Sequence, residues 1–162
     1  IGERIALVLN ERGVRTDSIP TAELLGRRTV DLSRYAGFVV GTSVYIGRAH
    51  KDTRRFLARN ESLLVARPVW LFSSGPTDTN EEIDERMDGF HTPASFRETV
   101  ELIDPEETQI FAGAIDPLKM KGLEKWIISK VGATVADARD WKEISAWAER
   151  IAGQAHSIAG AL

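Results

Sequence analysis

The sequence predicts an α/β fold, a three-layer α/β/α sandwich around an open parallel sheet. Strand and amphipathic helix patterns alternate along the chain, as in parallel strands joined by crossover helices. Two of the predicted strands are nearly continuous apolar runs, which is typical of strands covered on both faces. The chain has 162 residues, without a repeat or linker, so we expect one domain over residues 1–162.

The composition is that of an ordinary globular domain, with 43% hydrophobic and 28% charged residues. The net charge of −3 argues against nucleic acid as the main partner. No apolar run reaches the ~18 residues of a membrane-spanning helix, so no integral membrane segment is expected. The absence of cysteine excludes disulfides, iron–sulfur clusters and thiol catalysis, and favours a cytoplasmic location.

The first 34 residues predict one helix and little regular structure after it. Ile1, Ile5, Val8 and Leu9 have helical spacing, and Gly13 supplies a left-handed end. Residues 14–19 predict a short strand, and residues 21–34 are polar and irregular.

The middle of the chain carries the clearest pattern. A buried strand is predicted over residues 38–41 and another over residues 69–73, which Pro68 introduces. Residues 51–64 between them predict an amphipathic helix. Its expected inward residues are Phe56, Leu57, Leu63 and Leu64.

The last part of the chain predicts an acidic loop over residues 77–89, and then a helix that begins at Thr92 and Pro93 and ends at Ile103. A strand over residues 109–114 follows, and then a helix from Asp116 to Gly132. Asp140 and Glu143 have the spacing of a capping box ahead of a final helix.

The carboxyl ends of the two apolar strands are the candidate binding site. Both strands run into short loops of small polar residues, and parallel strands place such loops in one crevice, where open α/β sheets bind ligands. Small residues let backbone N–H groups approach a planar heteroaromatic ring, and a tyrosine ring can lie against its face. This pattern suggests a flavin. The candidate residues are Thr42, Ser43, Val44, Tyr45, Ile46, Gly47, Ser73, Ser74, Gly75, Pro76 and Thr77.

Simpler interpretations exist for these features. By position alone Tyr45 is as consistent with a packed aromatic residue as with a flavin platform, and residues 73–76 are compatible with an ordinary turn. The acidic residues of 77–89 lack EF-hand spacing. His50, His91 and His156 are scattered without ligand spacing, so no metal site is expected. No general acid, base or nucleophile stands out.

The chain resembles the flavodoxin-like superfamily, and within it the branch of the menaquinone-dependent protoporphyrinogen oxidases. Residues 41–48 match the branch's Gly-x-Ser-aliphatic-x-x-Gly loop, residues 112–115 its Ala-Gly-Ala-aliphatic segment, and Asp140-Trp141 its C-terminal helix. The resemblance implies FMN as cofactor. It also implies a first strand with a phosphate-binding loop. Since the sequence begins in what looks like the middle of the first helix, we expect that strand to be missing from it.

Three functions remain open at this level. The first is an FMN-dependent electron carrier or small oxidoreductase that works with a redox partner protein or a quinone. The second is protoporphyrinogen oxidation with a quinone acceptor, although residues 77–89 are acidic where that branch is basic. The third is a non-redox binding module on a degenerate flavodoxin-like scaffold. The sequence leaves the oligomeric state and the physiological substrate open.

Overall fold

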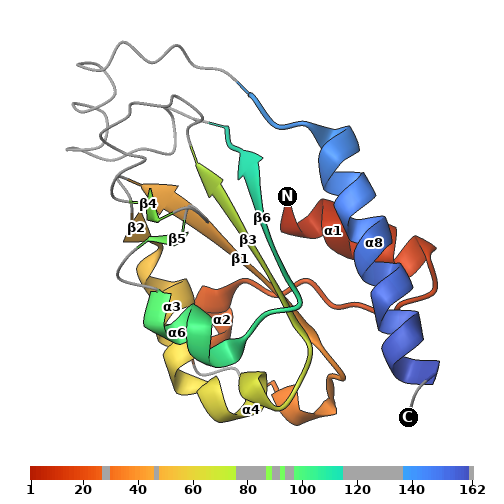
Figure 1. Cartoon of the computed structure of the whole chain (residues 1–162), viewed down its shortest axis with the longest axis horizontal. Coiled ribbons are helices and arrows are strands. Elements are labelled where there is room, and N and C mark those ends of the chain that lie inside the picture. Colours follow the sequence, from red (N-terminus) through yellow and green to blue (C-terminus); the bar gives the residue numbers. More distant parts are fainter. Residues whose placement is uncertain are drawn as a thin grey trace.

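A computed structural model describes residues 1–26, 30–45, 48–75, 87–88, 92–93, 97–114 and 137–160. Its main sheet has the order β2-β1-β3-β6 (Figure 1). The strands are β1 (Phe38–Tyr45), β2 (Arg48–Ala49), β3 (Val69–Gly75) and β6 (Glu107–Ala112). The pairs β1–β3 and β3–β6 are parallel, and β2 folds back antiparallel onto the end of β1. The predicted α/β fold with an open parallel sheet is therefore confirmed.

Helices cover the sheet on two faces (Figure 1). On one face lie α1 (Gly2–Glu11) and α8 (Trp141–Gly160). On the other lie α2 (Thr21–Leu24), α3 (Lys51–Arg59), α4 (Glu61–Val65) and α6 (Arg97–Ile103). A 3-10 turn, η1 (Leu32–Arg34), precedes β1. Within the described part of the chain, no helix combines the length and apolar character that crossing a membrane requires.

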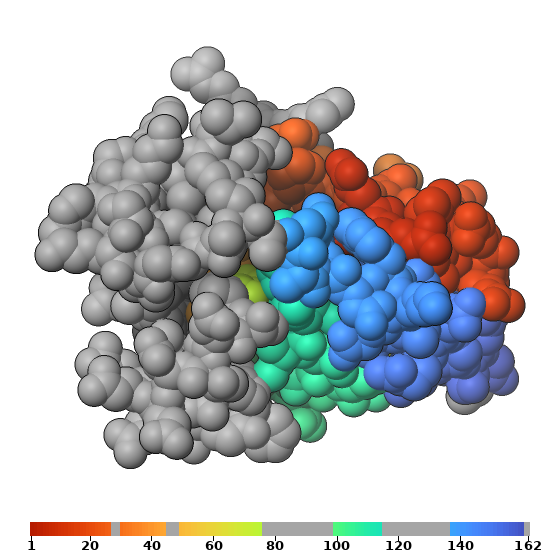
Figure 2. Space-filling model, turned by 90° about the horizontal axis from the view of Figure 1, so that it is seen from above, coloured from red at the N-terminus to blue at the C-terminus, as the bar shows by residue number. Residues whose placement is uncertain are grey.

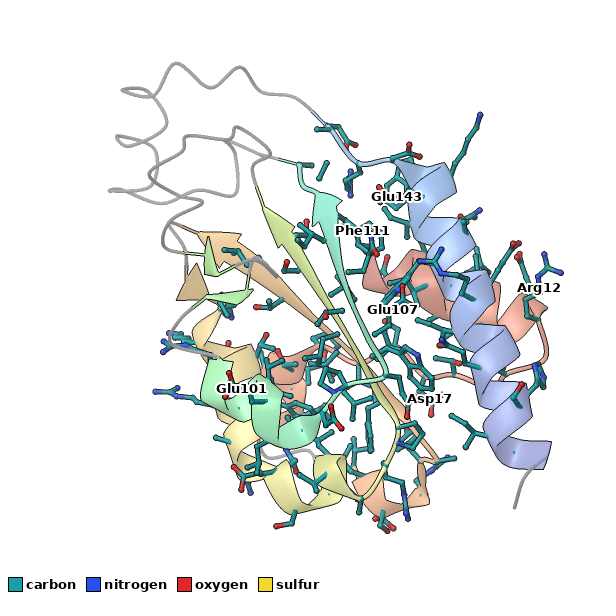
Figure 3. All side chains as sticks on the ribbon, in the orientation of Figure 1. Arg12, Asp17, Glu101, Glu107, Phe111 and Glu143 are labelled. Atoms are coloured by element: carbon teal, nitrogen blue, oxygen red, sulfur yellow. The ribbon has the colours of Figure 1, made fainter. Side chains whose placement is uncertain are left out.

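The face under α1 and α8 has an aromatic core. Trp147 and Phe111 make edge contact with ring centroids 5.6 Å apart, and Phe72 lies 5.9 Å from each. Figure 3 shows Phe111 between β6 and α8. The indole nitrogen of Trp147 is buried and has no nitrogen or oxygen partner among the described residues, which fits its place among aromatic rings. Trp70 in the same core donates from its indole nitrogen to Gln154 Oε1 at 2.6 Å.

The second core lies between the sheet and the helices that join its strands. Leu57 and Leu64 are fully buried there against Val40, Val69 and Leu71 of the two central strands. The central strands thus bury side chains on both faces, as their continuous apolar sequences require.

The helices from the two ends of the described chain pack against each other. Arg4 Nε donates to Ser145 Oγ at 3.0 Å, and Arg12 pairs with Glu149. Figure 2 shows α1 in red and α8 in blue side by side, and Figure 3 shows Arg12 reaching toward α8. This pairing closes the aromatic core from outside.

The predicted first helix is confirmed, and Gly13 ends it with φ of +82°. The strand predicted over residues 14–19 is wrong, because the segment pairs with no strand among the described residues. Asn10 holds it instead: Asn10 Oδ1 accepts from the Thr16 N–H, and Asn10 Nδ2 donates to the Thr16 carbonyl. Residues 21–34, predicted irregular, contain α2 and η1.

Both central strands extend beyond their predicted ends, β1 to Tyr45 and β3 to Gly75. The predicted helix over residues 51–64 is divided at Asn60, whose side chain donates to the Phe56 carbonyl at 2.7 Å. Phe56, Leu57 and Leu64 are buried as predicted. Leu63 is only partly buried.

The predictions for the later part of the chain had mixed outcomes. The helix start at Thr92 and Pro93 is wrong, because β5 (Thr92–Pro93) pairs antiparallel with β4 (Met87–Asp88), and α6 begins at Arg97. β4 also lies inside the predicted loop of residues 77–89, the rest of which is outside the described residues. The helix predicted from Asp116 to Gly132 is outside them too. The strand predicted over residues 109–114 is present as β6.

Candidate functional site

The carboxyl ends of β1 and β3 lie side by side, so their small polar residues form two cross-strand pairs. Thr42 is the register partner of Ser73, and Ser43 is the partner of Ser74. Side chains alternate between the faces of a sheet. Ser43 and Ser74 therefore share the face of α1 and α8, and Thr42 and Ser73 share the opposite face. Ser43 is exposed, and both β3 serines are partly buried.

Thr42 has a structural role that its sequence position did not suggest. Its side chain is only 7% exposed. The hydroxyl accepts from the His50 N–H at 3.0 Å and donates to the Ser43 carbonyl at 3.1 Å. By accepting from His50 the hydroxyl holds the start of α3 against β1, while its donor is used within β1, and Ser43 is left as the outward-facing hydroxyl of this strand end.

Glycines let the backbone and rings pack closely at this edge. A Cβ on Gly41 would lie 2.1 Å from Phe72 Cζ, so this glycine accommodates a ring rather than a loop bend. A Cβ on Gly75 would lie 3.1 Å from the Val44 carbonyl oxygen, and one on Gly113 would lie 3.0 Å from the Gly75 carbonyl oxygen. At Gly75 and Gly113 the strand ends therefore pack backbone against backbone.

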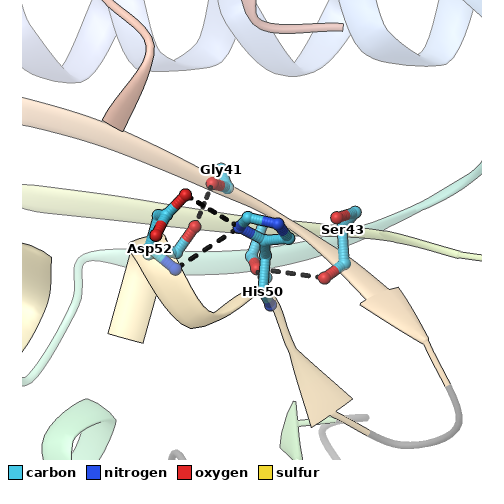
Figure 4. Close-up of polar contacts among 6 residues, drawn as sticks. Gly41, Ser43, His50 and Asp52 are labelled. Atoms are coloured by element: carbon cyan, nitrogen blue, oxygen red, sulfur yellow. Dashed lines mark hydrogen bonds and ion pairs between the residues drawn. The ribbon is translucent and has the colours of Figure 1, made fainter. Parts of the chain in front are cut away.

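His50 and Asp52 border the outer side of β1 (Figure 4). His50 is the N-cap of α3, and its Nδ1 accepts from the Asp52 N–H at 3.3 Å. The Asp52 carboxylate lies 3.7 Å from the same nitrogen. The His50 N–H donates to the Ser43 carbonyl at 3.0 Å, and Thr53 Oγ1 donates to the Gly41 carbonyl at 3.4 Å. These contacts fix the start of α3 beside the end of β1.

His50 is not among the site residues predicted from the sequence. The spacing of the histidines is wrong for metal ligands, and no other role was predicted for them. The available signal was local: a histidine directly before an amphipathic helix, with aspartate two residues later, is compatible with an N-cap beside the strand end.

The β6 side of this edge carries an ion pair. Ala114 forms a bridge with Asp137, and the Ala138 N–H donates to the Gly113 carbonyl. Arg139 donates to both Asp137 carboxylate oxygens, at 2.7 and 2.6 Å, and these bonds lower the pKa of Asp137 to about 2. The Arg139 guanidinium also lies 4.6 Å from the Trp141 ring centroid. The Arg139 guanidinium thus contacts Asp137 and Trp141 of the same chain.

The structure describes part of the predicted site. At the strand ends Thr42 and Ser43 pair with Ser73 and Ser74, and Gly75 follows on β3, where it pairs with Ala112 of β6. Val44 is buried, and Tyr45 ends β1, where it pairs with Arg48 through the backbone. Ile46, Gly47, Pro76 and Thr77 lie outside the described residues.

Comparison with known proteins identifies the family. The model of the flavodoxin domain matches residues 1–140. The chain belongs to the flavodoxin domain family. A search of curated protein sequences found no match. Flavodoxin domains usually bind FMN, so the family supports an FMN-binding redox role at this general level.

The described residues of this flavodoxin domain are chemically suited to FMN. The hydroxyls of Ser43, Ser73 and Ser74 offer neutral hydrogen-bonding groups at this edge of the sheet, and Gly75 and Gly113 place no side chain beside them. A planar heteroaromatic ring with a polar edge needs such groups and tolerates few bulky side chains beside it.

Proposed function

We propose that this flavodoxin domain binds FMN at the carboxyl ends of β1 and β3 and transfers electrons to or from a redox partner protein or a quinone. The observation that carries the proposal is the pairing of Ser43 with Ser74 on one face of adjacent parallel strand ends. Open α/β sheets bind ligands at this edge. The cofactor supplies the electron-transfer chemistry.

The protein's part is to bind and orient the cofactor. Ser43 and Ser74 are the groups that would hydrogen-bond its polar edge, and Gly75 allows the close approach. Thr42 acts indirectly, because its buried hydroxyl accepts from the His50 N–H and so holds the start of α3 beside β1. We propose that Tyr45 stacks on the ring, as the sequence pattern suggests, and that residues 46–47 and 76–77 complete the cradle.

Two other functions are compatible with the family. The match of residues 41–48 and 112–115 to the protoporphyrinogen oxidase branch supports that activity, with a quinone as acceptor. The acidic residues 77–89 argue against protoporphyrinogen oxidation at a membrane surface. Their negative charges would be repelled by an anionic lipid surface. A non-redox binding module is the alternative if the protein does not take up a flavin.

Absorption spectroscopy of the purified protein, with mass analysis of the released ligand, tests the proposal. In a titration of apoprotein with FMN, binding should quench the flavin fluorescence, and the quenching should saturate when the sites are full. We expect Tyr45→Ala to weaken binding roughly tenfold, since a stacked aromatic ring contributes on the order of 1 kcal/mol beyond its buried area. Tyr35→Ala is the control, because Tyr35 lies before β1, where its hydroxyl donates to Asp17. A colourless protein that does not respond to FMN would exclude the flavin function.

A further inference from the structure

The two ring nitrogens of His50 have different roles. Nδ1 is 3.3 Å from the backbone N–H donor of Asp52, and in the neutral ring a nitrogen that accepts such a bond carries no proton. A neutral imidazole has one N–H, which must then be on Nε2. The ring is held by the helix it caps and is nonetheless half exposed, with 50% of the side chain accessible.

The position of His50 places its free donor at the strand end. Its backbone N–H is bonded to the Ser43 carbonyl, and Figure 4 shows the ring between Asp52 and Ser43. Asp52 lies next to Nδ1, so Nε2 is on the side of the ring away from Asp52. Among the described residues, no hydrogen-bond partner of Nε2 is present.

We infer that His50 is a ligand-binding residue: Nε2–H donates a hydrogen bond to an acceptor atom of the molecule held beside Ser43, while Nδ1 caps α3. This inference rests on the proposed function, and FMN is the ligand with which it is tested. The cap fixes both the tautomer and the ring orientation, so the donor is set in place before the ligand arrives. Asp52 supplies the N–H that selects this tautomer.

Two substitutions separate the roles of the nitrogens. His50→Asn keeps a good N-cap acceptor close to the backbone and removes the distal donor. His50→Gln places an amide N–H near the position of Nε2 and removes the cap. We expect His50→Asn to keep the wild-type thermal stability and to bind FMN about three- to tenfold more weakly, the loss typical of one neutral hydrogen bond. His50→Gln should bind FMN within about twofold of wild type and be less stable, since only the cap is lost. His156→Asn, at an exposed position on α8, is the control.

NMR of the histidine ring nitrogens of the wild-type protein gives a readout that does not depend on the variants. The Nε2–H tautomer is expected before FMN is added, with a shift of the Nε2 resonance on addition. If wild type does not bind FMN, the proposed function fails. If wild type binds but His50→Asn binds equally well, or if Nδ1 carries the proton, the role assigned to His50 is wrong and the flavin function stands.

Discussion

The ring of Phe72 lies over Gly41, its register partner on β1. A Cβ on Gly41 would lie 2.1, 2.5 and 2.7 Å from three atoms of that ring. Phe72 in turn contacts Phe111 and Trp147, which leaves it little room to move. The glycine at this strand position is therefore required by the aromatic core.

We expect Gly41→Ala to lower the free energy of unfolding by about 1–3 kcal/mol, because the added methyl forces the ring out of its packed position. Urea denaturation measures this. Gly153→Ala on α8 is the matched control: a Cβ there meets nothing within 4 Å. That control should raise the stability by roughly 0.5–1 kcal/mol, since alanine is the better helix former. Equal effects of the two substitutions would show that the contact with Phe72 is unimportant.

Phe111 and Ile110 are neighbours on β6 with opposite exposure, 1% and 38%. Phe111→Ala should reduce the free energy of unfolding by about 3–5 kcal/mol, because it leaves a cavity between Phe72 and Trp147. Ile110→Ala should cost much less, since much of that side chain is already in water. Chemical denaturation of both variants checks the difference, and similar losses would contradict the burial assigned to Phe111.

Asp140 caps the last helix, and its Oδ1 accepts from the N–H groups of Lys142 and Glu143 at 2.8 and 3.1 Å. We expect Asp140→Ala to lower the melting temperature, by a loss of about 1 kcal/mol in the free energy of unfolding. Asp140→Asn keeps an acceptor oxygen and should stay close to wild type. A loss in the asparagine variant as large as in the alanine variant would assign the effect to charge and not to the cap.

The Asp137–Arg139 pair predicts a pH dependence with a definite sign. Its hydrogen bonds lower the pKa of Asp137 from 3.8 to about 2, so the pair favours the folded chain above pH about 4 and loses this effect as the pH falls toward 2. Arg139→Gln should return the pKa toward 3.8. A carbon-13 NMR titration of the Asp137 carboxyl group measures this shift, and an unchanged pKa in the variant would rule out Arg139 as its cause.

The sequence predicted the fold better than the details of the site. The apolar runs around Val40 and Leu71 were enough to predict two parallel strands, because burial on both faces leaves a continuous pattern. The strand ends were placed too early, since Thr42, Ser43 and Ser74 resemble loop residues although their backbones pair across the sheet.

Other features depend on contacts between distant residues and could not be predicted from local patterns. Gly41 was predicted as the last residue of a strand, and nothing in the neighbouring sequence indicates that the ring of Phe72 lies over it. Residues 14–19 have a strand-like sequence, but a strand forms only with a partner. The orientation of His50 depends on a backbone N–H two residues further on, which composition does not reveal.

The pairing of α1 with α8 has a consequence for biosynthesis. α1 and the central strands leave the ribosome before residues 141–160, so Trp70 and Phe72 lack the cover of α8 until that helix has emerged. Contacts between residues so far apart in sequence slow folding, and exposed apolar surface in such intermediates promotes aggregation. Nascent chains stalled before residue 141 should therefore be sensitive to protease and bind chaperones, and acquire resistance once α8 has emerged.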